Sequence, residues 1–105
     1  MALLASQETD GTIMVALPVR FDFKTYEEFH SEVLPRIAHA LKPNVCFSFR
    51  LTEYIDSAGL GMLLLARERA SVRSGQVQLV GVQGRVSEVL RLAHFERLFP
   101  IEWAA

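Results

Sequence analysis

The chain has 105 residues, of which half are hydrophobic and 22% are charged, a composition typical of a compact folded protein rather than a disordered one. This length predicts one domain, residues 1–105, that buries a core without needing disulfides or metals. The 11 basic and 12 acidic residues give a formal charge of −1, which argues against a nucleic-acid-binding surface.

Cysteine content and the first residues indicate the compartment. The single cysteine, Cys46, cannot form an internal disulfide and fits a reducing environment. The apolar start of the chain, residues 1–5, is too short for a signal peptide or a membrane span. We therefore expect a cytoplasmic protein that does not bind a membrane.

Two short strands are predicted at the start of the chain. Residues 3–6 predict an edge strand, and residues 9–11, Thr-Asp-Gly, carry a hairpin turn signal. Residues 13–17 predict the second strand. Pro18 then ends central pairing or marks an edge, because proline cannot donate to a strand ladder.

A helix is predicted after this hairpin. Thr25 and Glu28 fit a capping box, in which Thr25 caps the helix and Glu28 reaches back to it. Apolar residues at helical spacing predict a buried stripe that consists of Tyr26, Phe29, Val33, Ile37 and Leu41. Pro35 predicts a kink or a break near Leu34.

After a turn at residues 42–44, apolar residues alternate with more polar ones over residues 45–51. The alternation predicts a strand with one apolar face. A strand covered by helices on both sides would be apolar on both faces, so the pattern indicates helices concentrated on one face of the sheet.

Ser57 follows this strand and begins a predicted helix. It has two interpretations. As an N-cap, its oxygen would accept from a backbone N–H in the first turn, which stabilises a helix by about 1 kcal/mol. Alternatively, it is a hydroxyl that is modified or that does chemistry. Gly59 and Gly61 favour this second interpretation, because each costs up to about 1 kcal/mol in a helix, which indicates that something approaches the backbone closely.

A serine hydrolase is a weak alternative. The nucleophile elbow G-x-S-x-G would need glycine where the chain has Ile55, and no phosphate-binding G-x-x-x-x-G-K motif follows. A nucleophilic serine also needs a base, and none of His30, His39 and His94 lies in a recognisable catalytic context. The spacing of His30 and His39 does not match paired metal ligands on a helix either. We therefore predict no catalytic residue, no metal site and no cofactor.

The rest of the chain continues the alternation of helices and strands. The helix after Ser57 is expected to run to about Arg73 and to stop at residues 74–75, Ser-Gly. Residues 77–80 predict a strand, residues 81–84 a loop, and residues 86–93 an amphipathic helix. Residues 99–103, which include Pro100, predict a final edge strand. This order predicts an α/β fold with a mixed sheet, in which right-handed crossovers place the connecting helices on one face.

The segment Asp56-Ser57-Ala58-Gly59-Leu60-Gly61 resembles the D-S-[SA]-G-L-G signature of STAS domains, in particular of bacterial anti-sigma factor antagonists. The similarity extends over nearly the whole chain. It implies a single STAS-like domain with a mixed four- to five-stranded sheet and helices packed mainly on one face.

A second segment of the resemblance is Val19-Arg20-Phe21-Asp22, which corresponds to a G-E-L-D-like segment of the family. The aspartate and the bulky apolar position match, whereas the glycine and the glutamate do not. Asp22 is therefore expected beside the serine turn, with a solvated residue before a helix as the alternative. Arg20 replaces an acid, and it could pair with Asp22, contact a partner or receive a phosphate.

The resemblance also implies a function. Ser57 would be phosphorylated by a partner that is both an anti-sigma factor and a serine kinase, and the unphosphorylated chain would sequester this partner. Phosphorylation would release it, and a metal-dependent serine phosphatase would reset the switch. The partner-binding residues implied in this way are Asp22, Asp56, Ser57, Ala58, Gly59, Leu60, Gly61 and Met62. The chain would be a monomer or a weak dimer, and the alternative is a constitutive STAS scaffold or transporter-accessory subunit without a phospho-switch.

Overall fold

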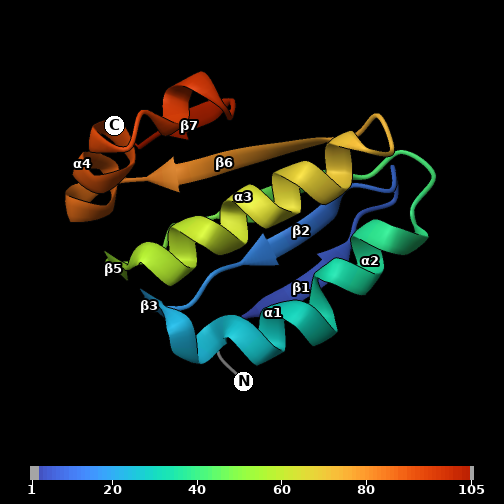
Figure 1. Ribbon diagram of the computed structural model, residues 1–105, viewed down its shortest axis with the longest axis horizontal. Coiled ribbons are helices and arrows are strands. Elements are labelled where there is room, and N and C mark those ends of the chain that lie inside the picture. Colours follow the sequence, from blue (N-terminus) through green and yellow to red (C-terminus); the bar gives the residue numbers. More distant parts are fainter. Residues whose placement is uncertain (1–2, 105) are drawn as a thin grey trace.

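The computed structural model describes residues 3–104, which form an α/β fold (Figure 1). Met1 and Ala2, part of the N-terminal segment considered above, lie outside the described residues. Within these residues the strands of the main sheet are β1 (Leu4–Gln7), β2 (Ile13–Ala16), β4 (Asn44–Ser48), β6 (Gln76–Val82) and β7 (Ile101–Trp103). This five-stranded sheet has the order β1-β2-β4-β6-β7, and only the β1–β2 pair is antiparallel. The predicted α/β class and mixed sheet are therefore confirmed.

Two further strands, β3 (Arg20–Phe21) and β5 (Tyr54–Ile55), pair with each other in a separate two-stranded sheet, which we call the ribbon. The sequence pattern does not predict this ribbon. Strands of two residues show no periodicity, so local sequence gives no signal for them.

The helices of the described part are α1 (Tyr26–Glu32), α2 (Leu34–His39), α3 (Ser57–Ser71) and α4 (Gly84–Leu92), with 3-10 turns η1 (Phe23–Thr25) and η2 (Phe95–Arg97). Figure 1 shows α1, α2 and α3 on the same face of the main sheet, and α4 beyond the end of β6. None of these helices is long and apolar enough to cross a membrane.

The hairpin at the start of the chain forms as predicted, with β1 displaced by one residue. Gly11 has a φ of 91°, a conformation that side chains disfavour. Asp10 Oδ1 accepts a hydrogen bond of 2.9 Å from the Thr12 amide, which closes the turn. Pro18 follows the end of β2, as expected.

The core lies between the main sheet and the layer of α1, α2 and α3. Phe29 of α1 and Phe47 of β4 are both fully buried, and their rings stack with centroids 6.4 Å apart. Phe21 of the ribbon is also fully buried, so the ribbon is anchored in the same core.

The break predicted near Leu34 is confirmed, because α1 and α2 are separate helices with Pro35 in the first turn of α2. The middle members of the predicted stripe are buried, namely Phe29, Val33 and Ile37. The prediction was wrong for Tyr26 and Leu41, which are 51% and 93% exposed. Leu41 lies beyond the end of α2, where helical spacing no longer applies.

The predicted capping box is wrong. Thr25 is buried and makes no capping hydrogen bond through its side chain. Glu28 Oε1 instead accepts a hydrogen bond of 3.0 Å from the Leu3 amide, which ties the start of the chain to α1. Because η1 precedes α1, the capping side chain is that of Asp22.

Several element boundaries differ from the prediction. β4 ends before Leu51, which is 66% exposed, and Cys46 on its predicted polar side is buried. α3 ends slightly earlier than expected, and Ser74 takes the left-handed conformation with a φ of 61°. Gly75 is needed for packing instead, since a Cβ there would overlap the carbonyl of Pro43.

The predicted loop at residues 81–84 is also wrong. Gly81 and Val82 belong to β6, and Gly84 begins α4. Gly81 has a φ of 69° and lies at an irregularity in the pairing of β6 with β7, so the glycine marks a bulge rather than the end of the strand.

Candidate functional site

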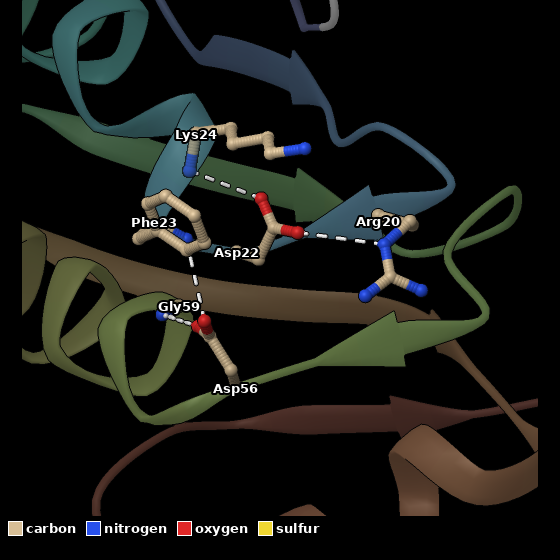
Figure 2. A network of polar contacts seen from close by, with 6 residues as sticks. All are labelled: Arg20, Asp22, Phe23, Lys24, Asp56 and Gly59. Carbon is tan, nitrogen blue, oxygen red and sulfur yellow. Dashed lines mark hydrogen bonds and ion pairs between the residues drawn. The ribbon is translucent and has the colours of Figure 1, made fainter.

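The ribbon brings two aspartates to one edge. β3 and β5 run parallel, with Arg20 opposite Tyr54. Asp22 follows β3 and Asp56 follows β5, so both lie at the carboxyl end of the ribbon (Figure 2). Each caps the helical segment that follows. Asp22 Oδ1 accepts from the Lys24 amide at 3.0 Å, and Asp56 Oδ1 accepts from the Gly59 amide at 2.9 Å.

Asp56 also joins the two segments to each other. Its second oxygen, Oδ2, accepts a hydrogen bond of 3.3 Å from the Phe23 amide in η1 (Figure 2). One carboxylate therefore holds the first turn of α3 against η1. Negative charge is favourable there because the amino terminus of α3 carries the positive end of the helix dipole.

Ser57 is the first residue of α3, and its side chain is exposed. The N-cap interpretation of Ser57 is wrong, since Asp56 is the cap. Within the described residues, no hydrogen bond of the Ser57 hydroxyl is found. The helix does not use this hydroxyl, which leaves it accessible to a second protein.

The close approach expected at the two glycines is found at Gly59 alone. A Cβ on Gly59 would lie 2.5 Å from the carbonyl oxygen of Phe21 and 2.7 Å from Cγ1 of Ile55. The chain itself, rather than a ligand, therefore requires glycine at this position. At Gly61, which is exposed, a Cβ would meet nothing within 4 Å.

The structure places the predicted partner-binding residues at different depths. Ser57 and Gly61 are exposed, and the half-buried members are Asp56, Ala58 and Leu60. Asp22 is 5% exposed, so it is not the solvated residue of the alternative interpretation. Met62 is 2% exposed and Gly59 is buried, so the predicted set is corrected at these two positions, which belong to the core rather than to the surface.

Arg20 pairs with Asp22, one of the three possibilities considered above. Its Nε lies 3.4 Å from Asp22 Oδ2, and its Cζ lies 4.1 Å from the centroid of the Tyr54 ring, over the ring face. A cation over an exposed aromatic ring gains roughly 0.5–1 kcal/mol. The arginine side chain remains 63% exposed.

Exposed apolar side chains surround this edge, and sequence reasoning missed them. Phe23, Val19 and Tyr54 are 65%, 48% and 42% exposed. Their sequence context gives no signal for exposure, because Phe23 stands two residues after the fully buried Phe21 in the same apolar stretch. Phe21 lies in β3, whereas Phe23 lies in η1 beyond the ribbon, and this tertiary arrangement determines which of the two rings faces solvent.

The histidines and the other potential ligands lie in other contacts. His30 and His39 contact the carbonyls of Tyr26 and Pro35 on their own helices, and His94 lies 3.5 Å from a carboxylate oxygen of Glu96. In the described part of the chain, no group of three or more His, Cys, Asp or Glu residues could hold a metal ion.

Comparison with solved structures shows the same fold. An anti-sigma-factor antagonist (STAS) domain protein from Planctomyces limnophilus superposes with a TM-score of 0.86 at 18% identity, over 100% of this chain and 92% of that one. The anti-sigma factor antagonist SpoIIAA in its unphosphorylated form gives 0.84 at 18% identity, over 99% and 89%. The murine anion transporter Slc26a9 gives 0.72 at 16% identity over 95% of this chain, which corresponds to 17% of the transporter.

Sequence comparison assigns the family. A "STAS-domain containing protein" of Pseudomonas aeruginosa (strain UCBPP-PA14) is 33% identical over 102 residues, which cover 96% of this chain and 99% of the relative. The family model described as "Mlab, STAS domain" matches residues 4–100. The chain therefore belongs to the STAS domain family.

Proposed function

We propose that this chain is a protein-binding module of the anti-sigma factor antagonist type, and that phosphorylation of Ser57 switches its docking. The observation that carries the proposal is the position of Ser57, exposed at the first turn of α3 with a hydroxyl that the helix cap does not use. A protein kinase needs such an accessible hydroxyl. SpoIIAA, which has the same fold, is described in both an unphosphorylated and a phosphorylated form, which supports a switch of this kind.

The charge of a phosphate explains how such a switch would act. A phosphoserine carries about −1.5 to −2 charges, and the amino terminus of α3 offers backbone donors and a favourable dipole, so the modified chain stays folded. A partner bound over Ser57 would have to bury this charge. Each partner carboxylate about 6 Å away would be repelled by about 3 kcal/mol per unit charge at an effective dielectric near 20. This corresponds to roughly a hundredfold loss of affinity, without any conformational change.

The proposed partners are an anti-sigma factor with serine kinase activity and a metal-dependent serine phosphatase. The docking surface consists of the exposed and half-buried residues around the first turn of α3. These residues are Asp56, Ser57, Ala58, Leu60 and Gly61, and the buried Asp22 lies at the same end of the ribbon.

The test combines the chain and Mg-ATP with candidate serine kinases of the histidine-kinase-like ATPase class from the same organism. Intact mass measurement is expected to show one phosphoryl group on the wild type and none on Ser57→Ala. Ser71→Ala is the matched control, because Ser71 lies on the same helix and its side chain is also exposed. We expect Ser71→Ala to be labelled as the wild type is. Labelling of Ser57→Ala would contradict the proposed site.

Binding to the same kinase tests the switch itself. Isothermal titration is expected to show that Ser57→Ala binds as the unmodified wild type does. Ser57→Asp should keep its circular dichroism spectrum and lose at least about tenfold in affinity, because aspartate carries less charge than phosphate. If the aspartate variant and the phosphorylated wild type bind as tightly as the unmodified chain, the switch is wrong.

A constitutive scaffold or transporter-accessory subunit is the second candidate. The observation that favours it is the exposed apolar group of Val19, Phe23 and Tyr54, which offers a docking surface that phosphorylation does not remove. A stable partner complex that forms equally with Ser57→Ala and Ser57→Asp would support this function.

A further inference from the structure

Arg20 is held in place from two directions. Its Nε lies 3.4 Å from Asp22 Oδ2, and its Cζ lies over the Tyr54 ring, 4.1 Å from the ring centroid. Asp22 is itself fixed, because it is 5% exposed and its other oxygen accepts the Lys24 amide at 3.0 Å. Both contacts favour the observed rotamer of Arg20, and a side chain that is ordered before binding loses less entropy on binding.

The terminal amino groups of Arg20 remain available. No partner of these groups is found within residues 3–104, and Figure 2 shows both terminal nitrogens projecting away from the Asp22 carboxylate. The side chain is 63% exposed. Two adjacent N–H groups of a guanidinium form a planar fork that binds a carboxylate or a phosphate oxygen pair through parallel hydrogen bonds.

The surroundings of the fork favour a protein partner. Tyr54 lies against the guanidinium, and Val19 and Phe23, which lie within three residues of Arg20 in the chain, expose apolar surface. Arginine and tyrosine within an apolar surrounding are the residues that most often dominate protein interfaces, because a partner that covers them excludes water and strengthens their hydrogen bonds. We call Val19, Arg20, Phe23 and Tyr54 the Arg20 patch.

The negative charges near the fork favour a carboxylate over a phosphate. Asp22 contacts the guanidinium, Asp56 lies at the same end of the ribbon, and Glu53 precedes Tyr54 with its side chain exposed. Repulsion from these acids grows with the charge of the ligand, so a singly charged carboxylate is repelled less than a phosphate dianion.

We propose that the Arg20 patch selects the docking partner by receiving one carboxylate side chain from an otherwise apolar segment of that partner. This inference rests on the proposed function, in that it assumes that this face of the molecule binds protein. It adds the chemistry of the segment that the face recognises, and it assigns Arg20 as the residue that determines this specificity.

The experiment uses the full chain with Ser57→Ala, so that phosphorylation plays no part in it. The probe is a synthetic peptide of leucine and serine with one central glutamate, and its matched control replaces that glutamate with glutamine. Nuclear magnetic resonance should show shifts of the Arg20 Nε–Hε signal and of the Tyr54 amide with the glutamate peptide. The glutamine peptide should leave both signals unchanged, and salt should weaken the binding of the glutamate peptide.

Variants test whether the fork is responsible. Arg20→Lys keeps the charge but lacks the fork, and it should weaken peptide binding about fivefold. Arg85→Lys changes an exposed arginine on α4 and should have no effect. Tyr54→Leu should weaken binding as well, whereas Tyr54→Phe retains the ring face and should not. Equal binding by Arg20→Lys and the parent chain would overturn the inference.

A titration with inorganic phosphate separates the two anion chemistries. If phosphate shifts the Arg20 signal at lower concentrations than the glutamate peptide does, the carboxylate assignment is wrong. Failure of this inference is distinguishable from failure of the proposed function. A chain that releases its kinase on Ser57 phosphorylation, but whose Arg20→Lys variant binds the peptide normally, retains the function and loses only the inference.

Discussion

Asp56 shows how much one side chain contributes to this site. Its two oxygens accept hydrogen bonds from two segments, the Gly59 amide in α3 and the Phe23 amide in η1. Its role as a cap leaves the neighbouring Ser57 hydroxyl unused by the helix. The Ser57 hydroxyl is therefore not needed for the helix cap, because the preceding residue provides it.

Replacing Asp56 tests this role. Asp56→Ala is expected to lower the free energy of unfolding by about 1–2 kcal/mol, because both amides lose their acceptor. Asp56→Asn should lose less, since an amide oxygen can still cap the helix. Urea denaturation measures both variants. Glu53→Ala is the control, an exposed acid close by in the chain, and the role assigned to Asp56 fails if the two alanine variants are equally stable.

Cys46 gives a pH-dependent prediction. Burial, and secondarily the negative charge of Glu102, raises the pKa of the Cys46 thiol above its ordinary value. The pKa of the thiol is higher in the folded than in the unfolded chain. The stabilisation that the protonated thiol gives is therefore complete below the pKa of the unfolded chain, and it is lost as the pH rises through the pKa of the folded chain. We expect the stability difference between the wild type and Cys46→Ala to shrink from about pH 7 to about pH 10 in urea denaturation. A constant difference would contradict the predicted shift.

Among the elements, the long periodic ones could be predicted from the sequence. The hairpin, the helix after Ser57 and the break at Pro35 follow from turn residues and apolar spacing, which act locally. The ribbon could not be predicted, because the pairing of Arg20 with Tyr54 joins distant segments and two-residue strands have no pattern of their own. Thr25 and Glu28 fit a capping box locally, but the tertiary placement of η1 gave the cap to Asp22.

The site residues also divide into features that the sequence predicts and features that it does not. The signature indicated the turn that carries Ser57, but it did not reveal that Met62 faces the core. Nor did it show that Asp22 is 5% exposed and pairs with Arg20. Burial of each of these residues depends on how α3 packs against the ribbon and the sheet, which no short stretch of sequence specifies.

The two glycines in the first turns of α3 form a matched pair. Gly59→Ala is expected to destabilise the fold by more than about 1 kcal/mol, because the new methyl group would meet the backbone of Phe21 at 2.5 Å. Gly61→Ala meets open space and should stabilise the helix by about 0.5–1 kcal/mol. Thermal denaturation shows whether each variant is more or less stable than the wild type. A Gly59→Ala variant that is more stable than the wild type would contradict the close contact between Gly59 and the Phe21 backbone.

At the scale of the whole molecule, the main sheet and its helical layer share one core that carries the ribbon through Phe21. Phe47 of the central strand β4 packs at the middle of this core against Phe29. The net free energy of unfolding of a domain of this size is only about 5–15 kcal/mol, so the contribution of a single core side chain is a large fraction of it.

Phe47→Ala is therefore expected to cost about 3–5 kcal/mol, because it removes a fully buried ring and leaves a cavity. Leu92→Ala, at a residue that is 82% exposed, should change the free energy of unfolding by no more than about 0.5 kcal/mol. Guanidinium denaturation followed by circular dichroism compares the two. Similar losses of unfolding free energy in the two variants would contradict the placement of Phe47 in the core.

The separate pairing of the ribbon has a consequence for how chains of this kind diversify. Arg20, Tyr54 and Phe23 lie outside the main sheet, and their side chains contribute no hydrogen bond to it. Mutations at these positions are therefore expected to alter the exposed surface while the architecture persists. Under the proposed function, a cell that contains several such chains would keep their signalling routes separate by changes confined to these few surface positions.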